Sequence, residues 1–157
     1  MKIKVLFVCL GNICRSPMAE GVFKAQVEKA GLSDKIEIDS AGTSAYHIGE
    51  LADPRMREIA MQHGITLTHL ARQVKPEDLN EFDYVIAMDP INLSDLQRLA
   101  PNPKAKVKLM RSFGVNADDL AIPDPYFGGN DGFEEVYELL ENFTGALLEE
   151  IEATLQN

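Results

Sequence analysis

The stretch FVCLGNICRSP, residues 7–17, joins an apolar run to the start of a predicted helix. Residues 2–8 are short, continuous and rich in β-branched side chains, which is typical of a strand buried in a parallel sheet. Ser16 and Pro17 predict where the helix begins, with Ser16 as its N-cap and Pro17 as its first helical residue. Cys9 therefore lies between a buried strand and a helix N-terminus. Most buried cysteines are small apolar residues without chemistry, so the residues around Cys9 decide whether it has a role.

Strand-like and helix-like patterns alternate along the rest of the chain. The further predicted strands are residues 36–40, 84–88 and 107–110. The predicted helices, in which apolar residues recur at helical spacing, are residues 17–30, 54–63, 93–99 and 133–155. This alternation predicts a three-layer α/β fold, with a four-stranded parallel sheet and helices on both of its faces. We expect a single domain over residues 1–157.

The composition is that of an ordinary globular protein, with 45% hydrophobic and 25% charged residues. The formal net charge of −10 disfavours nucleic-acid binding, which needs clustered lysine and arginine. No apolar stretch approaches the roughly 18 residues of a membrane span, and residues 1–4 lead into the first strand without a signal-peptide cleavage site. Two cysteines only five residues apart make a poor structural disulfide. We therefore expect a cytoplasmic protein that binds neither membrane nor nucleic acid.

Ligands of open parallel sheets bind outside the carboxyl ends of the strands. The loop from Cys9 to Arg15 lies at that edge, and so do the loops after the other predicted strands. One of these is the stretch 111–131. About 20 residues without secondary structure are unusual in a compact domain unless the loop has a function. The sequence thus predicts a site formed by the loop after Cys9 together with the 111–131 stretch.

The loop after Cys9, which we call the anion loop (residues 9–16), has the features of an anion-binding site. Gly11 permits backbone conformations that other residues avoid, and Asn12 tolerates the left-handed region, so the loop can turn successive N–H groups inward. The following helix adds the positive end of its dipole, and Arg15 offers a planar fork for two phosphate oxygens. The expected ligand is a tetrahedral oxyanion. The predicted phosphate-binding residues are Leu10, Gly11, Asn12, Ile13, Cys14, Arg15 and Ser16.

In this environment Cys9 is a candidate nucleophile. A thiol close to a helix N-terminus and an arginine loses its proton more readily than a free cysteine, and the Ser16 hydroxyl can donate a hydrogen bond to the thiolate. The predicted reaction is attack on phosphorus, with positive groups stabilising the equatorial oxygens. The loop lacks the Gly-Lys-Ser/Thr ending of ATP-binding loops, and the two cysteines have no clustered histidines with which to bind zinc. We expect neither a metal nor another cofactor.

The pattern C-x5-R-S from Cys9 to Ser16 resembles the low-molecular-weight protein tyrosine phosphatases. Further matching segments extend over nearly the whole chain, namely Asp39-Ser40, Asp53-Pro54-Arg55, His63-Gly64-Ile65, His69, Ala71-Arg72-Gln73-Val74, Phe82-Asp83-Tyr84, Met88-Asp89 and Asp124-Pro125-Tyr126. The resemblance implies hydrolysis of protein phosphotyrosine, and of small aryl phosphates, through a cysteinyl-phosphate intermediate. It also implies phosphotyrosine-containing proteins as partners, a tyrosine kinase among them, with inorganic phosphate as the product.

A phenolate leaves poorly unless it is protonated, so the reaction needs a general acid. Three Asp-Pro pairs are candidates, at Asp53, Asp89 and Asp124. Asp53 and Asp89 each precede a predicted helix, which favours a role as N-cap. Asp124 stands between two prolines in the 111–131 stretch, and the resemblance assigns the acid to this Asp-Pro-Tyr segment. We therefore predict that Asp124 is the acid of the first step and the base that activates water in the second.

The remaining site residues rest on the resemblance alone. It implies aromatic walls around the substrate ring, with Tyr126 and Phe127 on one side and Tyr46 on the other. It also implies that Ser40 and His69 support the anion loop without touching the substrate.

Related reactions and roles are open alternatives at this stage. An arsenate reductase of this kind relays electrons through two further cysteines, and none follows Cys14. A protein-arginine phosphatase has a similar loop with threonine where Ile13 stands, and the bulkier, apolar Ile13 favours phosphotyrosine. A redox-sensing or phosphotyrosine-binding module that uses the same loop is a non-enzyme alternative, but binding alone requires neither the nucleophile nor the acid. Cys14, which faces Cys9 across the loop, is either the partner in a reversible disulfide that protects Cys9 or a small packed thiol.

Overall fold

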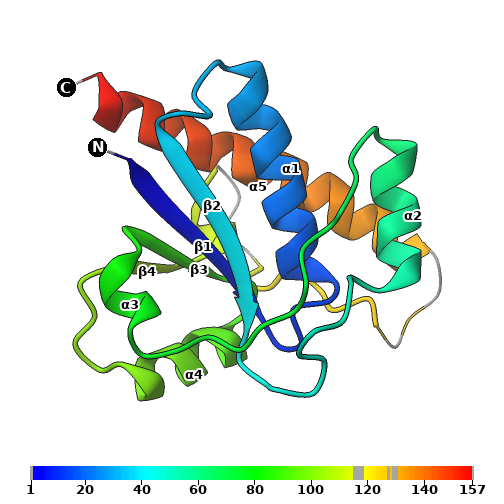
Figure 1. Cartoon of the computed structure of the whole chain (residues 1–157), viewed down its shortest axis with the longest axis horizontal. Helices are drawn as coiled ribbons and strands as arrows, with labels where there is room; N and C mark the ends of the chain where they lie inside the picture. Colours follow the sequence, from blue (N-terminus) through cyan, green and yellow to red (C-terminus); the bar gives the residue numbers. More distant parts are fainter. Residues whose placement is uncertain (1, 115–118, 127, 129–130, 157) are drawn as a thin grey trace.

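The computed structural model describes residues 2–114, 119–126, 128 and 131–156. The strands of its sheet are β1 (Ile3–Cys9), β2 (Ile36–Gly42), β3 (Tyr84–Ala87) and β4 (Lys106–Leu109). Their spatial order is β2-β1-β3-β4, and every neighbouring pair is parallel. Figure 1 shows helices on both faces of this sheet. The predicted three-layer α/β fold is confirmed.

Helices cover both faces of the sheet. Within the described residues they are α1 (Arg15–Lys29), α2 (Pro54–Gln62), α3 (Asp78–Glu81), α4 (Pro90–Leu99) and α5 (Asp131–Leu155), with a 3₁₀ turn, η1, at Met110–Ser112. In Figure 1, α1 and α5 lie on one face, and α3 and α4 lie on the other. In the described part of the chain, no helix is both long enough and apolar enough to cross a membrane.

Strand β1 is buried on both faces, which explains its continuous apolar sequence. Val5 and Phe7 belong to a core shared with α1 and α5, whereas Leu6 and Val8 belong to a second core on the side of α4. All four side chains are fully buried. The ring of Phe7 also meets Phe23 of α1 edge-on, at 5.6 Å between centroids. Both elements that flank the anion loop are therefore firmly packed.

The order of the strands places the anion loop at a reversal in the topology. β1 lies between β2 and β3, and α1 links β1 to β2 on one face while α4 links β3 to β4 on the other. Such a reversal opens a crevice at the carboxyl ends of the strands, where sheets of this class bind ligands. The segment 119–126 reaches the same edge, because the N–H of Ile122 donates to the carbonyl of Met88 at 2.7 Å.

The predicted start of the first helix is wrong. α1 begins at Arg15, its N-cap position is Cys14, and no side chain caps it there. Ser16 lies inside the first turn, where its hydroxyl contacts Cys9 and Asn12 instead of the helix backbone. Pro17 still suits this turn, because a backbone N–H there would have no helical acceptor. The sequence also does not predict α3 and η1, since segments of four and three residues are too short to show an apolar period.

Strand β2 ends against the anion loop at Gly42. A Cβ atom at Gly42 would lie 2.7 Å from the carbonyl oxygen of Leu10 and 3.1 Å from the amide nitrogen of Asn12. Both are backbone atoms, which cannot rotate away as a flexible side chain can. Glycine is therefore required where β2 and the loop approach each other.

Gly42→Ala should lower the free energy of unfolding by about 1 to 3 kcal/mol, the usual cost of overpacking, because the added methyl group displaces the anion loop. Gly145→Ala is the matched control. Gly145 lies inside α5, and its Cβ would meet nothing closer than 4.0 Å, so alanine should stabilise the helix by about 0.5 to 1 kcal/mol. Urea unfolding followed by circular dichroism measures both. Equal stability of the two variants would show that the approach of β2 to the loop imposes no constraint.

Candidate active site

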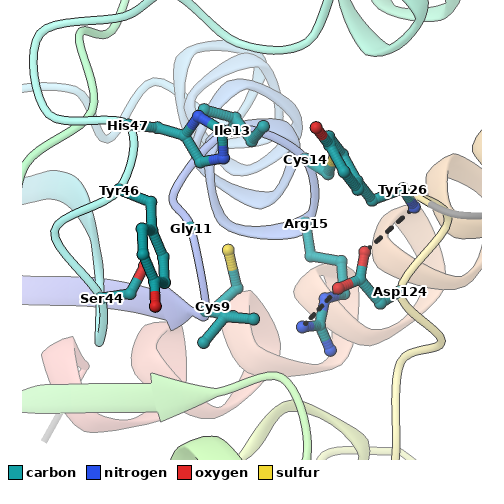
Figure 2. Close-up of a pocket in the computed structure, with 11 residues that line it drawn as sticks. Cys9, Gly11, Ile13, Cys14, Arg15, Ser44, Tyr46, His47, Asp124 and Tyr126 are labelled. Carbon is teal, nitrogen blue, oxygen red and sulfur yellow. Dashed lines mark hydrogen bonds and ion pairs between the residues drawn. The ribbon is translucent and has the colours of Figure 1, made fainter.

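A cavity of about 210 Å³ opens at the carboxyl end of β1. Cys9 lies at the base of the cavity and is only 3% exposed. Figure 2 shows the other lining side chains arranged around the Cys9 sulfur. The lining residues are Cys9, Leu10, Gly11, Ile13, Cys14, Arg15, Ser44, Tyr46, His47, Asp124 and Tyr126. The anion loop, the segment after β2 and the Asp-Pro-Tyr segment therefore meet in one cavity.

The backbone of the anion loop curls around the sulfur of Cys9. Asn12 has a φ of 57°, in the left-handed region, and its N–H donates to Cys9 Sγ at 3.3 Å. As far as the structure describes the chain, the N–H groups of Gly11, Ile13 and Cys14 have no acceptor. Free N–H groups next to a helix N-terminus form a nest for an anion. An oxyanion beside Cys9 would find several donors in place.

The side chain of Asn12 holds the loop in this shape. It is only 1% exposed. Its amide nitrogen donates to Ser16 Oγ at 2.7 Å and to Ser40 Oγ at 3.0 Å. Its amide oxygen accepts from the backbone N–H of Arg72 at 3.0 Å and lies 2.9 Å from His69 Nε2. A single buried amide thus links the loop to α1, to β2 and to the segment after α2, and each of its polar atoms is bonded twice.

His69 is itself held by two carboxylates. Its Nδ1 lies 3.4 Å from Glu20 Oε1 and 3.5 Å from Asp39 Oδ1. These three residue types bind metals in other proteins, and here their ligand atoms lie within 4.8 Å of one another. Lys24 and Arg72 already pair with the two carboxylates, at 2.6 and 3.1 Å, so a metal ion would have to compete with both. The cluster fixes the His69 ring against the anion loop.

The sulfur of Cys9 has a second polar neighbour in Ser16. The two atoms, Cys9 Sγ and Ser16 Oγ, are 3.0 Å apart, and Ser16 is fully buried. Because Ser16 Oγ accepts from the Asn12 amide, its own proton can point at the sulfur, which is closer than the Ala41 carbonyl at 3.4 Å. A thiolate at Cys9 would therefore accept one hydrogen bond from the backbone and one from a hydroxyl.

Arg15 is a buried cation in the first turn of α1, only 3% exposed. Its Nη1 donates to Asp89 Oδ2 at 2.6 Å and to the Ile122 carbonyl at 3.0 Å, and its Nη2 lies 3.5 Å from Asp124 Oδ2. Burial disfavours the charged form, but the negative charges of Cys9 and Asp89 outweigh it and raise the pKa of Arg15 above its ordinary value. The guanidinium is therefore a permanent positive charge at the cavity.

Asp124 lies at the edge of the cavity, between Arg15 and solvent. Its side chain is 34% exposed, and the backbone N–H of Tyr126 donates to its Oδ1 at 3.1 Å. Figure 2 draws this hydrogen bond and the ion pair between Arg15 and Asp124. The segment is anchored by Ile122, whose side chain is fully buried. The predicted acid is thus in a position from which it can exchange protons with both a ligand and water.

Aromatic side chains stand at the mouth of the cavity. Tyr46 is 86% exposed and Tyr126 is 37% exposed, and Figure 2 shows them on opposite sides of the Cys9 sulfur. His47 also lines the cavity, with its ring 6.2 Å from that of Tyr126, and nothing in the sequence singles it out. Phe127, the other predicted wall residue, lies outside the described residues.

Cys14 and Cys9 are both free thiols. Cys14 is 4% exposed. Burial raises the pKa of the Cys14 thiol far above its ordinary value, and the negative charges of Asp53 and Cys9 act in the same direction. Cys14 therefore stays a neutral thiol at physiological pH. Its disulfide with Cys9 stays a prediction.

Asp89 is the part of the site that the sequence does not predict. As predicted, Asp53 and Asp89 are both N-caps, accepting from the N–H groups of Arg55 and Asn92. Asp89 in addition bonds the buried Arg15 guanidinium, because β3 pairs with β1 and brings the start of α4 to the anion loop. A signal for this was available, since Asp89 follows a predicted strand at the same sheet edge as Cys9.

Comparison with known proteins shows which family the chain belongs to. The model of the low molecular weight phosphotyrosine protein phosphatases matches residues 4–157. The chain belongs to this family. It is 51% identical over 152 residues to a low molecular weight protein-tyrosine-phosphatase of Streptomyces coelicolor, a match that covers 94% of this chain and 93% of that protein.

Solved structures of the phosphatase family agree with the fold. The crystal structure of a protein tyrosine phosphatase from Entamoeba histolytica matches with a TM-score of 0.93 at 40% identity, covering 98% of this chain and 99% of that one. The structure of a Drosophila arginine phosphatase matches with a TM-score of 0.89 at 37% identity, covering 95% of this chain and 98% of that one.

Asp89→Asn should damage the site of this phosphatase, because one amide cannot replace both carboxylate oxygens. Asp89 Oδ1 accepts from Asn92 N, while Oδ2 accepts from Arg15; an asparagine must turn its NH₂ group toward one of these two donors. We expect the free energy of unfolding to fall by about 1.5 to 3 kcal/mol, typical of a hydrogen bond to a charged group, and vanadate to bind about tenfold more weakly as Arg15 loses its anchor.

The matched control is Asp53→Asn, which disturbs the other Asp-Pro cap and its pair with Arg55. It should cost comparable stability but leave vanadate affinity much less affected. Urea unfolding and isothermal titration with vanadate separate the two effects. Unchanged vanadate affinity in Asp89→Asn would mean that Arg15 does not need Asp89 to hold it.

Proposed function

We propose that this protein hydrolyses phosphotyrosine in proteins, and small aryl phosphates, through a cysteinyl-phosphate intermediate. Family membership supports phosphotyrosine phosphatase activity. One observation carries the mechanism: Cys9 Sγ accepts a backbone N–H and faces a hydroxyl at the base of a cavity that Arg15 and Asp124 also line. A nucleophile, a cation for the phosphate and an acid are what this reaction needs.

Substrate binding uses the hydrogen-bond donors of the anion loop and of Arg15. The phosphate oxygens accept from the amides of the anion loop and from Arg15, whose Nη1 is already occupied by Asp89 and Ile122, so that the rest of its fork faces the phosphate. The substrate ring lies between Tyr46 and Tyr126. Negative phosphate oxygens then take over from Asp124 as the partner of Arg15.

The reaction proceeds in two displacements at phosphorus. In the first, the Cys9 thiolate attacks, the S–P bond forms and the bond to the phenolic oxygen breaks, while Asp124 gives its proton to that oxygen. In the second, water attacks phosphorus and gives a proton to the Asp124 carboxylate, the S–P bond breaks, and inorganic phosphate leaves. Ser16 stabilises the departing thiolate by donating a hydrogen bond to it.

Asn12, Ser40 and His69 act without touching the substrate. Their hydrogen bonds hold the anion loop with its N–H groups directed at the phosphate position, so that no reorganisation is needed as charge develops. Loss of any one of them should reduce catalysis through the geometry of the loop.

The test is hydrolysis of p-nitrophenyl phosphate and of a phosphotyrosine peptide. The wild-type protein should turn over both, and Cys9→Ser should lose activity by about four orders of magnitude or more while still binding vanadate. Cys14→Ser, the same change at the neighbouring buried cysteine, should retain turnover. Equal activity of the two serine variants would exclude Cys9 as the nucleophile.

Asp124→Ala should slow the release of tyrosine far more than the release of p-nitrophenolate, because the latter leaves without a proton. We expect kcat on a phosphotyrosine peptide to fall by about 10² to 10⁴ and kcat on p-nitrophenyl phosphate to fall clearly less. Asp119→Ala removes a carboxylate from the same segment, where it caps the N–H of Ala121, and serves as the control. Steady-state kinetics on the two substrates decide, and equal losses on both would remove Asp124 from the role of acid.

A protein-arginine phosphatase is the second candidate, because the Drosophila arginine phosphatase is structurally similar. Ile13 lines the cavity and is 8% exposed. Its apolar side chain suits an aromatic ring better than the polar guanidino group of phosphoarginine. A higher kcat/KM on phosphoarginine peptides than on phosphotyrosine peptides would reverse the assignment.

A further inference from the structure

Exposed apolar side chains gather on the segments that border one side of the Cys9 cavity. Among the described residues, five of the ten exposed large hydrophobic side chains lie there. They form what we call the apolar rim: Leu10 (45% exposed), Tyr46 (86%), Ile48 (57%), Leu51 (44%) and Leu70 (55%). Single exposed hydrophobic residues are normal on protein surfaces, whereas a group of them beside a cavity indicates a binding surface.

The segments that carry the apolar rim are joined by backbone hydrogen bonds. Ser44 N donates to the Leu10 carbonyl at 2.9 Å, which ties the segment after β2 to the anion loop. Gly49 N donates to the Ala71 carbonyl, and Ala71 N donates to the Glu50 carbonyl, both at 2.8 Å. The rim is therefore one continuous platform whose backbone is fixed to the anion loop, not a set of independent loop tips.

Polar side chains on this platform already have partners. His47 Nδ1 lies 3.0 Å from Glu50 Oε2, and Arg72 Nη1 lies 3.0 Å from Asp78 Oδ2. Although the whole chain carries a formal charge of −10, the rim segments offer a partner apolar side chains beside polar groups that already have partners. This chemistry suits apolar residues better than charged ones.

We propose that the apolar rim binds apolar side chains that flank the phosphotyrosine of a protein substrate. The inference rests on the proposed function. A phosphotyrosine side chain that reaches Cys9 brings the substrate backbone to the mouth of the cavity, so the neighbouring side chains meet the rim. Contacts there add binding free energy that a small aryl phosphate cannot use.

The experiment compares a rim variant with a control on three substrates. The variant is Ile48→Ser combined with Leu70→Ser; both positions lie outside the catalytic residues. The control is Ile91→Ser, because Ile91 is 71% exposed and lies on α4, which carries none of the rim residues. The substrates are p-nitrophenyl phosphate and two phosphotyrosine peptides, one with leucine and one with serine at the flanking positions.

The wild-type protein should prefer the leucine peptide by about tenfold in kcat/KM, mainly through a lower KM, as burial of partly exposed side chains predicts. The rim variant should lose most of this preference and keep its activity on p-nitrophenyl phosphate, and Ile91→Ser should keep both. Equal use of the two peptides by the wild type, an undiminished preference in the rim variant, or an equal loss on p-nitrophenyl phosphate would each overturn the proposal.

Two further outcomes are distinguishable from these. If the wild type hydrolyses neither peptide, the phosphotyrosine function fails along with the rim. If sedimentation shows that the wild type is a dimer and the rim variant a monomer with the same peptide preference, the rim joins two copies of this chain and the substrate proposal is wrong.

Discussion

The buried amide of Asn12 is the contact that makes the cavity a site. A left-handed backbone at a non-glycine residue costs about 1 to 2 kcal/mol, and Asn12 adopts one, with a φ of 57°. Its four side-chain hydrogen bonds, each contributing about 0.5 to 1.5 kcal/mol, offset that cost. These hydrogen bonds therefore stabilise the anion loop in its left-handed conformation at Asn12. In this conformation the Asn12 N–H points toward Cys9 Sγ, and the Ser16 hydroxyl lies beside the same sulfur. Without this amide, two serines and a histidine would lose a buried partner.

The sheet positions the side chains that face the anion loop. Val8 of β1 pairs with Ala87 of β3, so the two strands end side by side, β1 at Cys9 and β3 two residues before Asp89, the cap of α4. Asp89 holds Arg15 from that cap, and Met88 holds Ile122, whose carbonyl also accepts from Arg15. Arg15 and the segment that carries Asp124 are thus both held in place by residues that follow β3. The parallel register of β1 and β3 thus helps to set the distances between Cys9, Arg15 and Asp124.

Local features of the sequence predict the fold and the anion loop. The parts of the site that they do not predict depend on contacts between residues far apart in the sequence. The strand, the glycine and asparagine of the loop, and Arg15 are close in sequence, so their joint meaning is visible. Asp89 and Arg15 are 74 residues apart, and His69 and Asn12 are 57 apart, so only the fold brings them together. Ser16 illustrates the opposite error. Ser-Pro is typical of a helix start, but the Ser16 hydroxyl forms hydrogen bonds with the buried Cys9 and Asn12 side chains instead of capping the helix. Only the resemblance to a family singled out Tyr46, Ser40 and His69.

The carboxylates that pair with Arg15 bear on catalysis under the proposed mechanism. A buried guanidinium is tolerable only when it is paired, and Arg15 is paired with Asp89 at 2.6 Å and, more loosely, with Asp124 at 3.5 Å. A phosphate that enters the nest replaces the weaker and more exposed partner first. Asp124 is then released from its contact with Arg15. Cys14 remains neutral and adds no competing charge. Under the proposed mechanism, binding of the oxyanion at Arg15 and release of Asp124 from the guanidinium are thus one event.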